Sequence, residues 1–196
     1  MTSKNDRGFG MFNSSPRHDM VGKSDESMNS TTGGAKTPQY VITCKDFFDS
    51  DIEGMDEDST PCLWIETGGG RLVTYDSSGE LGGDGKIVNK DPVVCMKYGS
   101  WGPLIQQYMY TGKKLDLITV TRLTSIEQTI VPIQRLEYAT CLIKTYEQYG
   151  DTVTFSFCYI EITDTNIAYN HNTGEKLGQT AMKFNMGSLK VELNEG

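Results

Sequence analysis

Apolar and polar positions divide the chain near residue 39. Residues 1–38 are rich in Ser, Gly, Asn, Asp and Lys, and their few apolar side chains, such as Phe9, Met11 and Phe12, follow neither a helical nor a strand period. A segment of this composition buries too little apolar surface to offset the entropy of ordering it. We therefore predict a disordered N-terminal head over residues 1–38 and one folded domain over residues 39–196. Docking of the head on a neighbouring molecule is the alternative.

From Tyr40 onward, short apolar runs alternate with clusters of Gly, Asp, Asn and Ser, which is typical of an all-β sandwich or barrel. Three glycines at residues 68–70 are expected to break or bulge a strand. An acidic connection is predicted at 49–60 and a long mobile loop at 76–90. Strands are predicted over residues 39–48, 62–67, 71–75, 91–98, 115–124, 129–146, 152–163 and 182–193.

One helix is predicted, from Ser100 to Gly112. Ser100 suits the N-cap, Pro103 is tolerated in a first helical turn, and Gly112 suits the left-handed residue that follows a helix. Leu104, Tyr108 and Thr111 share one face of this helix. The helix is therefore expected to be short and to pack on one side only.

The strand predicted at residues 152–163 has the clearest alternation in the chain. One face carries Val153, Phe155, Phe157 and Tyr159, and the other carries Thr154, Ser156 and Cys158. One face is strongly apolar and the second is only mildly polar. Such a strand suits a barrel wall that also meets a neighbouring subunit, although packing in the core explains it equally well.

Charge narrows the range of partners. With 18 Lys and Arg against 26 Asp and Glu, the net charge is -8 and the isoelectric point about 4.8. Clustered basic side chains, which phosphate contacts need, are missing, so we expect neither nucleic-acid binding nor membrane binding. No apolar run approaches the roughly 20 residues of a membrane helix, and the first 30 residues lack the apolar core of a secretory signal. Synthesis as a cytoplasmic protein is expected.

The five cysteines are Cys44, Cys62, Cys95, Cys141 and Cys158. Their number is odd, they are widely spaced and no CxxC pair occurs. Four of them stand among β-branched or aromatic residues, where a free thiol behaves as a small hydrophobic group. Buried thiols are favoured over disulfides or metal ligands.

The candidate catalytic and cofactor-binding motifs all lack residues that their chemistry requires. The stretch from Gly79 to Lys86 suggests a phosphate loop, but Ile87 stands where a Ser or Thr must hold magnesium, and Glu80 and Asp84 repel an anion.

Two further groupings are also weak. Cys158 with His171 and Asp164 would place a nucleophile in the middle of a strand, where it is buried rather than presented. Six carboxylates between residues 49 and 58 lack the Glu that closes a calcium loop, because Thr60 occupies position twelve of a loop that begins at Asp49. We therefore expect no enzyme activity, no metal and no cofactor.

The ordered part of the chain resembles the Hcp family, the inner tube proteins of type VI secretion systems. The resemblance is carried by the order of several pieces over residues 112–193. These are Thr111-Gly112 at the end of the helix, the run Leu115-Asp-Leu-Ile-Thr-Val-Thr-Arg-Leu123, Glu137–Tyr146, Thr154–Ile162 and the turn Asn172–Gly178. Weaker similarity reaches upstream to residue 40, while the head has no counterpart.

This resemblance implies an all-β, two-sheet barrel or sandwich with one short flanking α-helix. It implies hexameric rings of identical subunits that stack into a tube, and a sheath that expels the tube with spike and effector proteins. Secretion without a signal peptide after assembly in the cytoplasm follows from the same resemblance. The implied ring-stacking loop consists of Gly79, Glu80, Leu81, Gly82, Gly83, Asp84 and Gly85.

Trp101, Tyr108 and Tyr110 are predicted at the subunit interface, because aromatic side chains with a polar edge favour interface cores. The alternative for Trp101 and Tyr108 is that they seal the end of the barrel. Two other functions stay open: a β-sandwich module that binds carbohydrate or peptide through Trp64, Tyr75 and Trp101, and a phage-like tail tube subunit.

Overall fold

The computed structural model describes residues 39–48, 57–71, 74–75, 81–82, 87–126, 129–170 and 172–195. The predicted head at 1–38 lies outside the described residues. The elements are β1 (Tyr40–Thr43), β2 (Ser59–Cys62), β3 (Trp64–Arg71), β4 (Thr74–Tyr75), β5 (Leu81–Gly82), β6 (Ile87–Lys97), α1 (Gly102–Thr111), β7 (Leu115–Ile126), β8 (Thr129–Tyr149), β9 (Thr152–Cys158), β10 (Glu161–Tyr169), β11 (Lys176–Asn185) and β12 (Lys190–Glu195).

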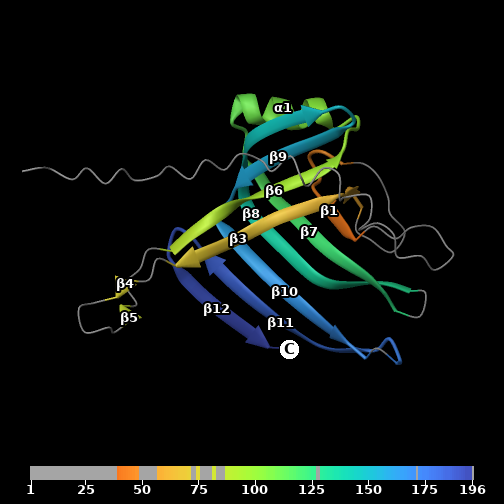
Figure 1. Cartoon of the computed structure of the whole chain (residues 1–196), viewed down its shortest axis with the longest axis vertical. Helices are drawn as coiled ribbons and strands as arrows, with labels where there is room; N and C mark the ends of the chain where they lie inside the picture. Colours follow the sequence, from red (N-terminus) through yellow and green to blue (C-terminus); the bar gives the residue numbers. More distant parts are fainter. Residues whose placement is uncertain are drawn as a thin grey trace, which may run out of the picture.

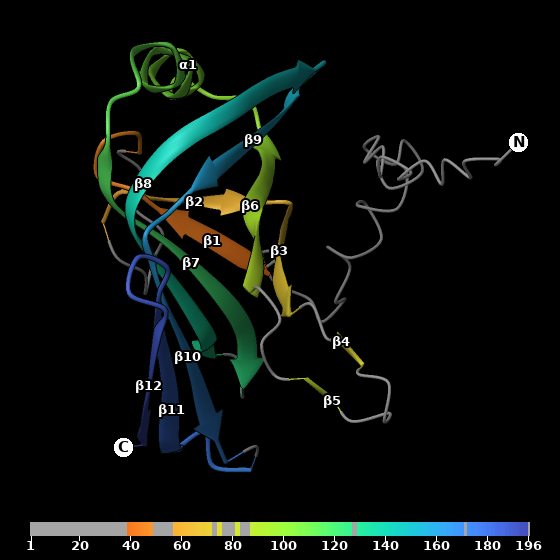
Figure 2. The ribbon, with the colours of Figure 1, turned by 90° about the vertical axis from the view of Figure 1, so that its left-hand side faces the viewer.

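The strands form two layers that share one strand. The first layer has the order β12-β11-β10-β8-β7-β1-β2, and the second has β8-β9-β6-β3, with antiparallel pairing throughout. Helix α1 lies across one end, while β10, β11 and β12 extend away from it, beyond the ends of β3 and β6 (Figures 1 and 2). The all-β prediction with one short flanking helix is confirmed, and the sheet is not closed.

Strand β8 belongs to both layers because its partners change along its length. Its first part pairs with β7 and β10, whereas Leu142 and the residues after it pair with β9. The change follows Thr140, whose φ of 55° lies in the left-handed region that a β-branched residue rarely adopts. The strand therefore turns from one layer into the other at this residue.

The core lies between the two layers, and Tyr138 of β8 crosses it. Its side chain is fully buried, and its aromatic ring lies 5.1 Å from that of Phe157 and 4.9 Å from that of Tyr159. Its hydroxyl donates a hydrogen bond to Oγ1 of Thr67 in β3, at 3.1 Å. The apolar face predicted for the strand at 152–163 is confirmed, because Val153, Phe155 and Phe157 are fully buried and Tyr159 is buried as well.

Helix α1 ends as predicted but begins and packs differently. Gly112 follows it in the left-handed conformation, with φ 62°. Its N-cap is Trp101 rather than Ser100, and no side chain caps it. The buried positions are Gly102, Ile105 and Tyr108, whereas Leu104 is exposed. The predicted apolar face through Leu104 and Thr111 was therefore wrong, since the helix turns Ile105 toward the core.

Two segments predicted as single strands are pairs of strands. The segment 152–163 divides at Tyr159 and Ile160 into β9 and β10, which pair with different parts of β8. The segment 182–193 is part of a hairpin of β11 and β12. The side-chain Oδ1 of Asn185 accepts hydrogen bonds from the N–H groups of Gly187 and Ser188, both at 3.0 Å, and this reverses the chain.

The first half of the domain also departs from the predicted boundaries. The strand predicted at 39–48 ends at Thr43, because the N–H groups of Phe47 and Phe48 both bond the carbonyl of Cys44 and form a turn. β2 begins inside the predicted connection, and β3 continues through the three glycines. The register shift lies at Thr67, just before them. The predicted loop at 76–90 contains β5 and the start of β6.

Gly112 and Gly68 provide a matched test of backbone conformation. An added Cβ meets nothing within 4 Å at either position, but only Gly112 has a positive φ. Gly112→Ala is therefore expected to lower the free energy of unfolding by about 1–2 kcal/mol, the cost of a left-handed alanine. Gly68→Ala is expected to change it by less than about 0.5 kcal/mol. Urea unfolding followed by circular dichroism measures both, and equal losses would contradict the prediction.

Candidate assembly surfaces

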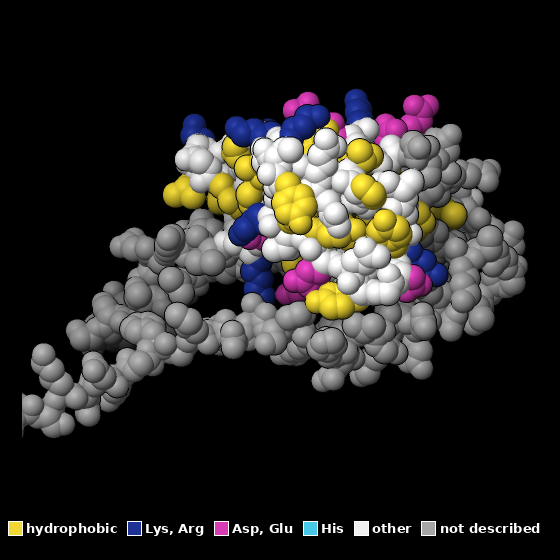
Figure 3. Space-filling view, turned by 90° about the horizontal axis from the view of Figure 1, so that it is seen from above, with side chains coloured by type: hydrophobic (Ala, Val, Ile, Leu, Met, Phe, Trp, Pro, Cys, Tyr) yellow, Lys and Arg dark blue, Asp and Glu magenta, His cyan; other side chains and the backbone are white. Residues whose placement is uncertain are grey.

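Several exposed apolar side chains gather at the end of the domain that carries α1. Figure 3 looks onto this end and shows several hydrophobic side chains among polar ones. The exposed members are Tyr98 at the end of β6, Leu104 and Tyr110 on α1, and Tyr149 at the end of β8. Tyr110 is 80% exposed. Three of the four are tyrosines, whose apolar ring and polar hydroxyl suit a wet or partly buried contact.

Two of the three aromatic residues predicted at the interface lie beneath this surface. Trp101 and Tyr108 are only 8% and 7% exposed. The Trp101 ring packs edge-on against Phe48 at 5.8 Å, and the Tyr108 ring packs against Phe47 at 5.0 Å. These contacts favour the alternative that they seal the end of the barrel. Tyr110 is the member of the three that is available to a partner.

The hydroxyl of Tyr108 has two polar partners. It donates to Oδ1 of Asp46 at 2.7 Å, and it accepts a hydrogen bond from Nζ of Lys113 at 2.5 Å. The hydrogen bond to Tyr108 raises the pKa of Lys113. This chain of bonds ties the end of α1 to the turn after β1.

The predicted ring-stacking loop at residues 79–85 is described only at Leu81 and Gly82. They form β5, which pairs with β4 in a small separate sheet. Gly79, Glu80, Gly83, Asp84 and Gly85 lie outside the described residues. The stacking role of this loop stays a prediction.

A second apolar surface lies on β11 and β12, and the sequence analysis missed it. The register places Phe184 opposite Val191 and Met182 opposite Leu193, so all four side chains share one face. Phe184 is buried, whereas Val191 and Leu193 are 61% and 64% exposed. The turn signal at Asn185 to Ser188 would have revealed this hairpin and its alternation. This face is therefore buried at Phe184 and exposed to solvent at Val191 and Leu193.

The opposite face of these strands is polar. Lys183 Nζ bonds Glu161 Oε1 at 2.8 Å, and Asn185 Nδ2 donates to Glu161 Oε2 at 3.3 Å. The bond from Lys183, and then that from Asn185, lowers the pKa of Glu161. Arg135 Nε lies 3.6 Å from Glu137 Oε1 in the neighbouring strand β8. Paired charges of both signs thus make this face hydrophilic without strong net charge.

An open groove of about 640 Å³ lies near the far ends of β10 and β11. Its lining residues are Ile133, Asn166, Ile167, Ala168, Leu177, Gly178, Gln179 and Thr180. None of these side chains is ionisable, so they provide no general acid or base.

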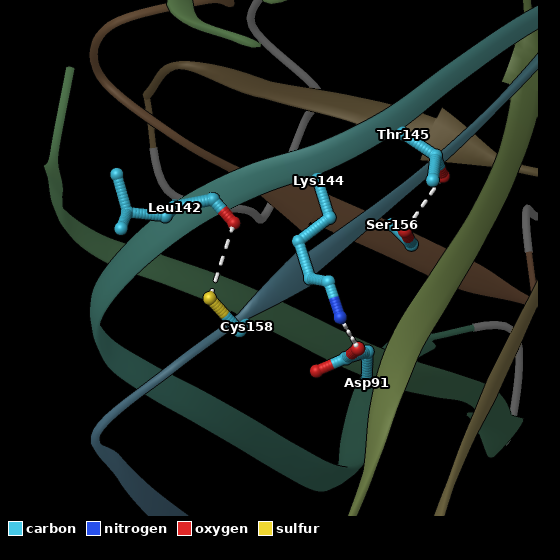
Figure 4. A network of polar contacts seen from close by, with 6 residues as sticks. All are labelled: Asp91, Leu142, Lys144, Thr145, Ser156 and Cys158. Atoms are coloured by element: carbon cyan, nitrogen blue, oxygen red, sulfur yellow. Dashed lines mark hydrogen bonds and ion pairs between the residues drawn. The ribbon is translucent and has the colours of Figure 1, made fainter. Parts of the chain in front are cut away.

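All five cysteines are free, and four of them are buried, as predicted. Burial raises the pKa of the Cys44, Cys62 and Cys141 thiols to about 12. Cys158 is half-buried, and its Sγ donates to the carbonyl of Leu142 at 3.8 Å (Figure 4). A buried thiol that stays protonated serves packing rather than catalysis.

Beside Cys158, two polar contacts join strands of the second layer. Lys144 of β8 pairs with Asp91 of β6, and Thr145 bonds Ser156 of β9 at 2.6 Å between their hydroxyls (Figure 4). His171, which the weak catalytic hypothesis requires, lies outside the described residues. Within the described parts of the chain, no three His, Cys, Asp or Glu side chains group into a metal site. No helix in those parts is long and apolar enough to span a membrane.

The described residues thus form a β-rich domain whose exposed apolar side chains gather at the α1 end and on one face of β11 and β12. No protein-family model matches the chain, and no curated protein matches it in sequence. Solved structures do match.

A type six secretion system protein superposes with a TM-score of 0.71 at 13% identity, over 80% of this chain and 100% of that chain. Hcp1 from Salmonella typhimurium gives 0.59 at 8% identity, over 78% and 97% of the two chains. A mutant Hcp1 from the E. coli EAEC 042 pathovar gives 0.56 at 11%, over 81% and 99%. The chain therefore has the fold of the Hcp proteins of type VI secretion systems.

The raised thiol pKa values predict how the cysteines react. Thiolate is the reactive form, so thiols with a pKa of about 12 react slowly at pH 8. With a chromogenic disulfide reagent, the native protein should show one faster thiol, Cys158, and four that react only on unfolding. Cys158→Ser should remove the fast phase and leave four thiols in denaturant. Rapid reaction of a second native thiol would contradict the burial assignment.

Proposed function

We propose that the chain is a structural subunit of the inner tube of a type VI secretion system. Its subunits form rings of six, the rings stack, and the tube is expelled together with spike and effector proteins. The observation that carries this proposal is the shared fold, which extends over 97–100% of the length of the three Hcp-type structures compared. The role is mechanical, and no substrate is turned over.

The two exposed apolar surfaces support assembly. One lies at the α1 end, and the other lies on β11 and β12, which extend in the opposite direction (Figures 1 and 2). Because they are different surfaces at different ends, they suit head-to-tail contacts, which close into rings or continue as filaments. Tyr110 is the residue that we assign to a subunit contact at the α1 end.

The structure argues against the binding module and leaves the tail tube subunit as an alternative function. A carbohydrate- or peptide-binding module would need Trp64, Tyr75 and Trp101 to line one concave site, but Trp101 is buried against Phe48. A phage-like tail tube subunit would share the tube architecture and differ in its partners. A type VI secretion system effector from Yersinia pestis also has this fold, with a TM-score of 0.53, so a specialised exported variant is a second form of the same proposal.

Partners and location follow from the proposed role. The subunit associates with itself and with the sheath, spike and effectors of the secretion machine. It assembles in the cytoplasm and leaves the cell inside the machine.

Assembly state is the first test. Light scattering on a sizing column, followed by negative-stain microscopy, should show rings with an open centre or short stacks of them. The mass of the smallest ring should be about six times that of the chain. A monomer over a wide concentration range would contradict the tube role and favour the binding module, in which case ligand screening becomes the next step.

Deletion of residues 79–85 separates stacking from folding. After the deletion, single rings should still form and the melting temperature of the domain should be unchanged, because β4 and β5 form a sheet separate from the core layers. It should shorten or abolish stacked tubes, as counted by electron microscopy. Tubes of unchanged length would remove the stacking role from this loop.

A further inference from the structure

Strand β12 is an edge strand whose apolar residues face solvent. Its described backbone pairing is with β11, so alternate N–H and C=O groups point away from the sheet. Val191 and Leu193 stand two residues apart in β12 and are 61% and 64% exposed, and Leu189, in the turn just before the strand, is 65% exposed. We call these three residues the β12 row. Edge strands usually carry charges or proline that prevent such a row from pairing with another chain.

Packing within the domain does not explain the exposed apolar side chains of the β12 row. Leu189 has φ 54°, in the left-handed region that Gly or Asn occupies at lower cost. Its side chain gains little burial within the domain in return. β3 and β6 of the second layer end before β10 to β12 do (Figure 2), so the second layer does not extend over this end of the sheet. A strained, exposed leucine beside two exposed aliphatic residues suits a segment that packs on them.

We propose that residues 8–12 of the same chain, Gly-Phe-Gly-Met-Phe, add to β12 as a further strand. Phe9 and Met11 stand two residues apart, so in an extended strand both point to one face. That alternation matches the spacing of Val191 and Leu193, and large apolar pairs of this kind stabilise neighbouring strands. The intervening Gly10 permits close approach of the backbone. This inference concerns the edge of β12, whereas the subunit contact proposed above uses the face of β11 and β12, so the two are tested separately.

Chain length and charge agree with this occupant. Between Phe12 and Gln39 the extended chain spans up to about 90 Å, more than the diameter of a domain of this size. Attachment to the same chain also gives the segment a high effective concentration at β12. Residues 1–18 carry Lys4, Arg7 and Arg17 against one acidic residue, whereas β12 carries Glu192 and Glu195 against one lysine. The segment and the strand are therefore complementary in charge.

Hydrogen exchange of the full-length protein, followed by mass spectrometry at low micromolar concentration, tests the proposal. In the wild type, residues 8–12 and the outward amides of β12 should both be protected. The double variant Phe9→Ser/Met11→Ser should speed exchange in β12 at least tenfold and leave β9 unchanged. Met20→Ser/Val21→Ser, in the same head, should have no effect. Val191→Ser/Leu193→Ser should release residues 8–12 to the same extent.

Two outcomes overturn the proposal. Exchange of residues 8–12 at the rate of a free peptide in the wild type would show that the segment does not pair. Protection of β12 that rises with protein concentration and survives Phe9→Ser/Met11→Ser would assign the β12 row to a contact between copies. The first result leaves ring formation untouched, and the second is itself a contact between copies, whose stoichiometry light scattering reports separately.

Discussion

The contact of Tyr138 with both layers is the constraint on which the rest of the domain depends. Tyr138 belongs to β8, the strand that the layers share, and its ring packs on Phe157 while its hydroxyl reaches Thr67 of β3. Burial raises its pKa, so it stays a neutral hydrogen-bond donor. The change of partners that follows Thr140 lets one strand serve two sheets. Two layers held in this way enclose a core without closing into a barrel.

Because the sheet is open, part of it extends beyond the region in which the two layers cover each other. The layers cover one another near α1, but β10 to β12 continue past this overlap, so a face that is buried at Phe184 becomes exposed at Val191 and Leu193. At the α1 end the core is covered: Trp101 and Tyr108 are buried there, and Tyr110 is exposed. The domain therefore buries its own core and keeps two apolar surfaces for contacts beyond it. This division is what a subunit of a larger assembly needs.

The chemistry of the described residues agrees with the structural role proposed above. The buried thiols have a raised pKa and fill space between strands, as Cys141 does beside Tyr138. Glu161 of β10 and Lys183 of β11 pair with each other and, with Asn185, Ser188, Lys190 and Glu192, line a small hollow on the polar face. These interactions hold neighbouring strands together, and the architecture they stabilise is the fold of the Hcp structures.

The sequence by itself determined the fold class, the single helix and its end at Gly112, the apolar face of β9 and the burial of four cysteines. Each depends on local periodicity or on a backbone preference that neighbouring residues reveal. Only the tertiary structure decided that Ile105 rather than Leu104 faces the core, that Trp101 is buried, and that the segment after Met182 is a hairpin with an exposed row. A residue is buried only if another element covers it, and which elements overlap is set by the pairing of strands far apart in the chain. Leu193 and Phe184 show the difference: they lie on one face of one hairpin, and only the reach of the second layer separates a core residue from an exposed one.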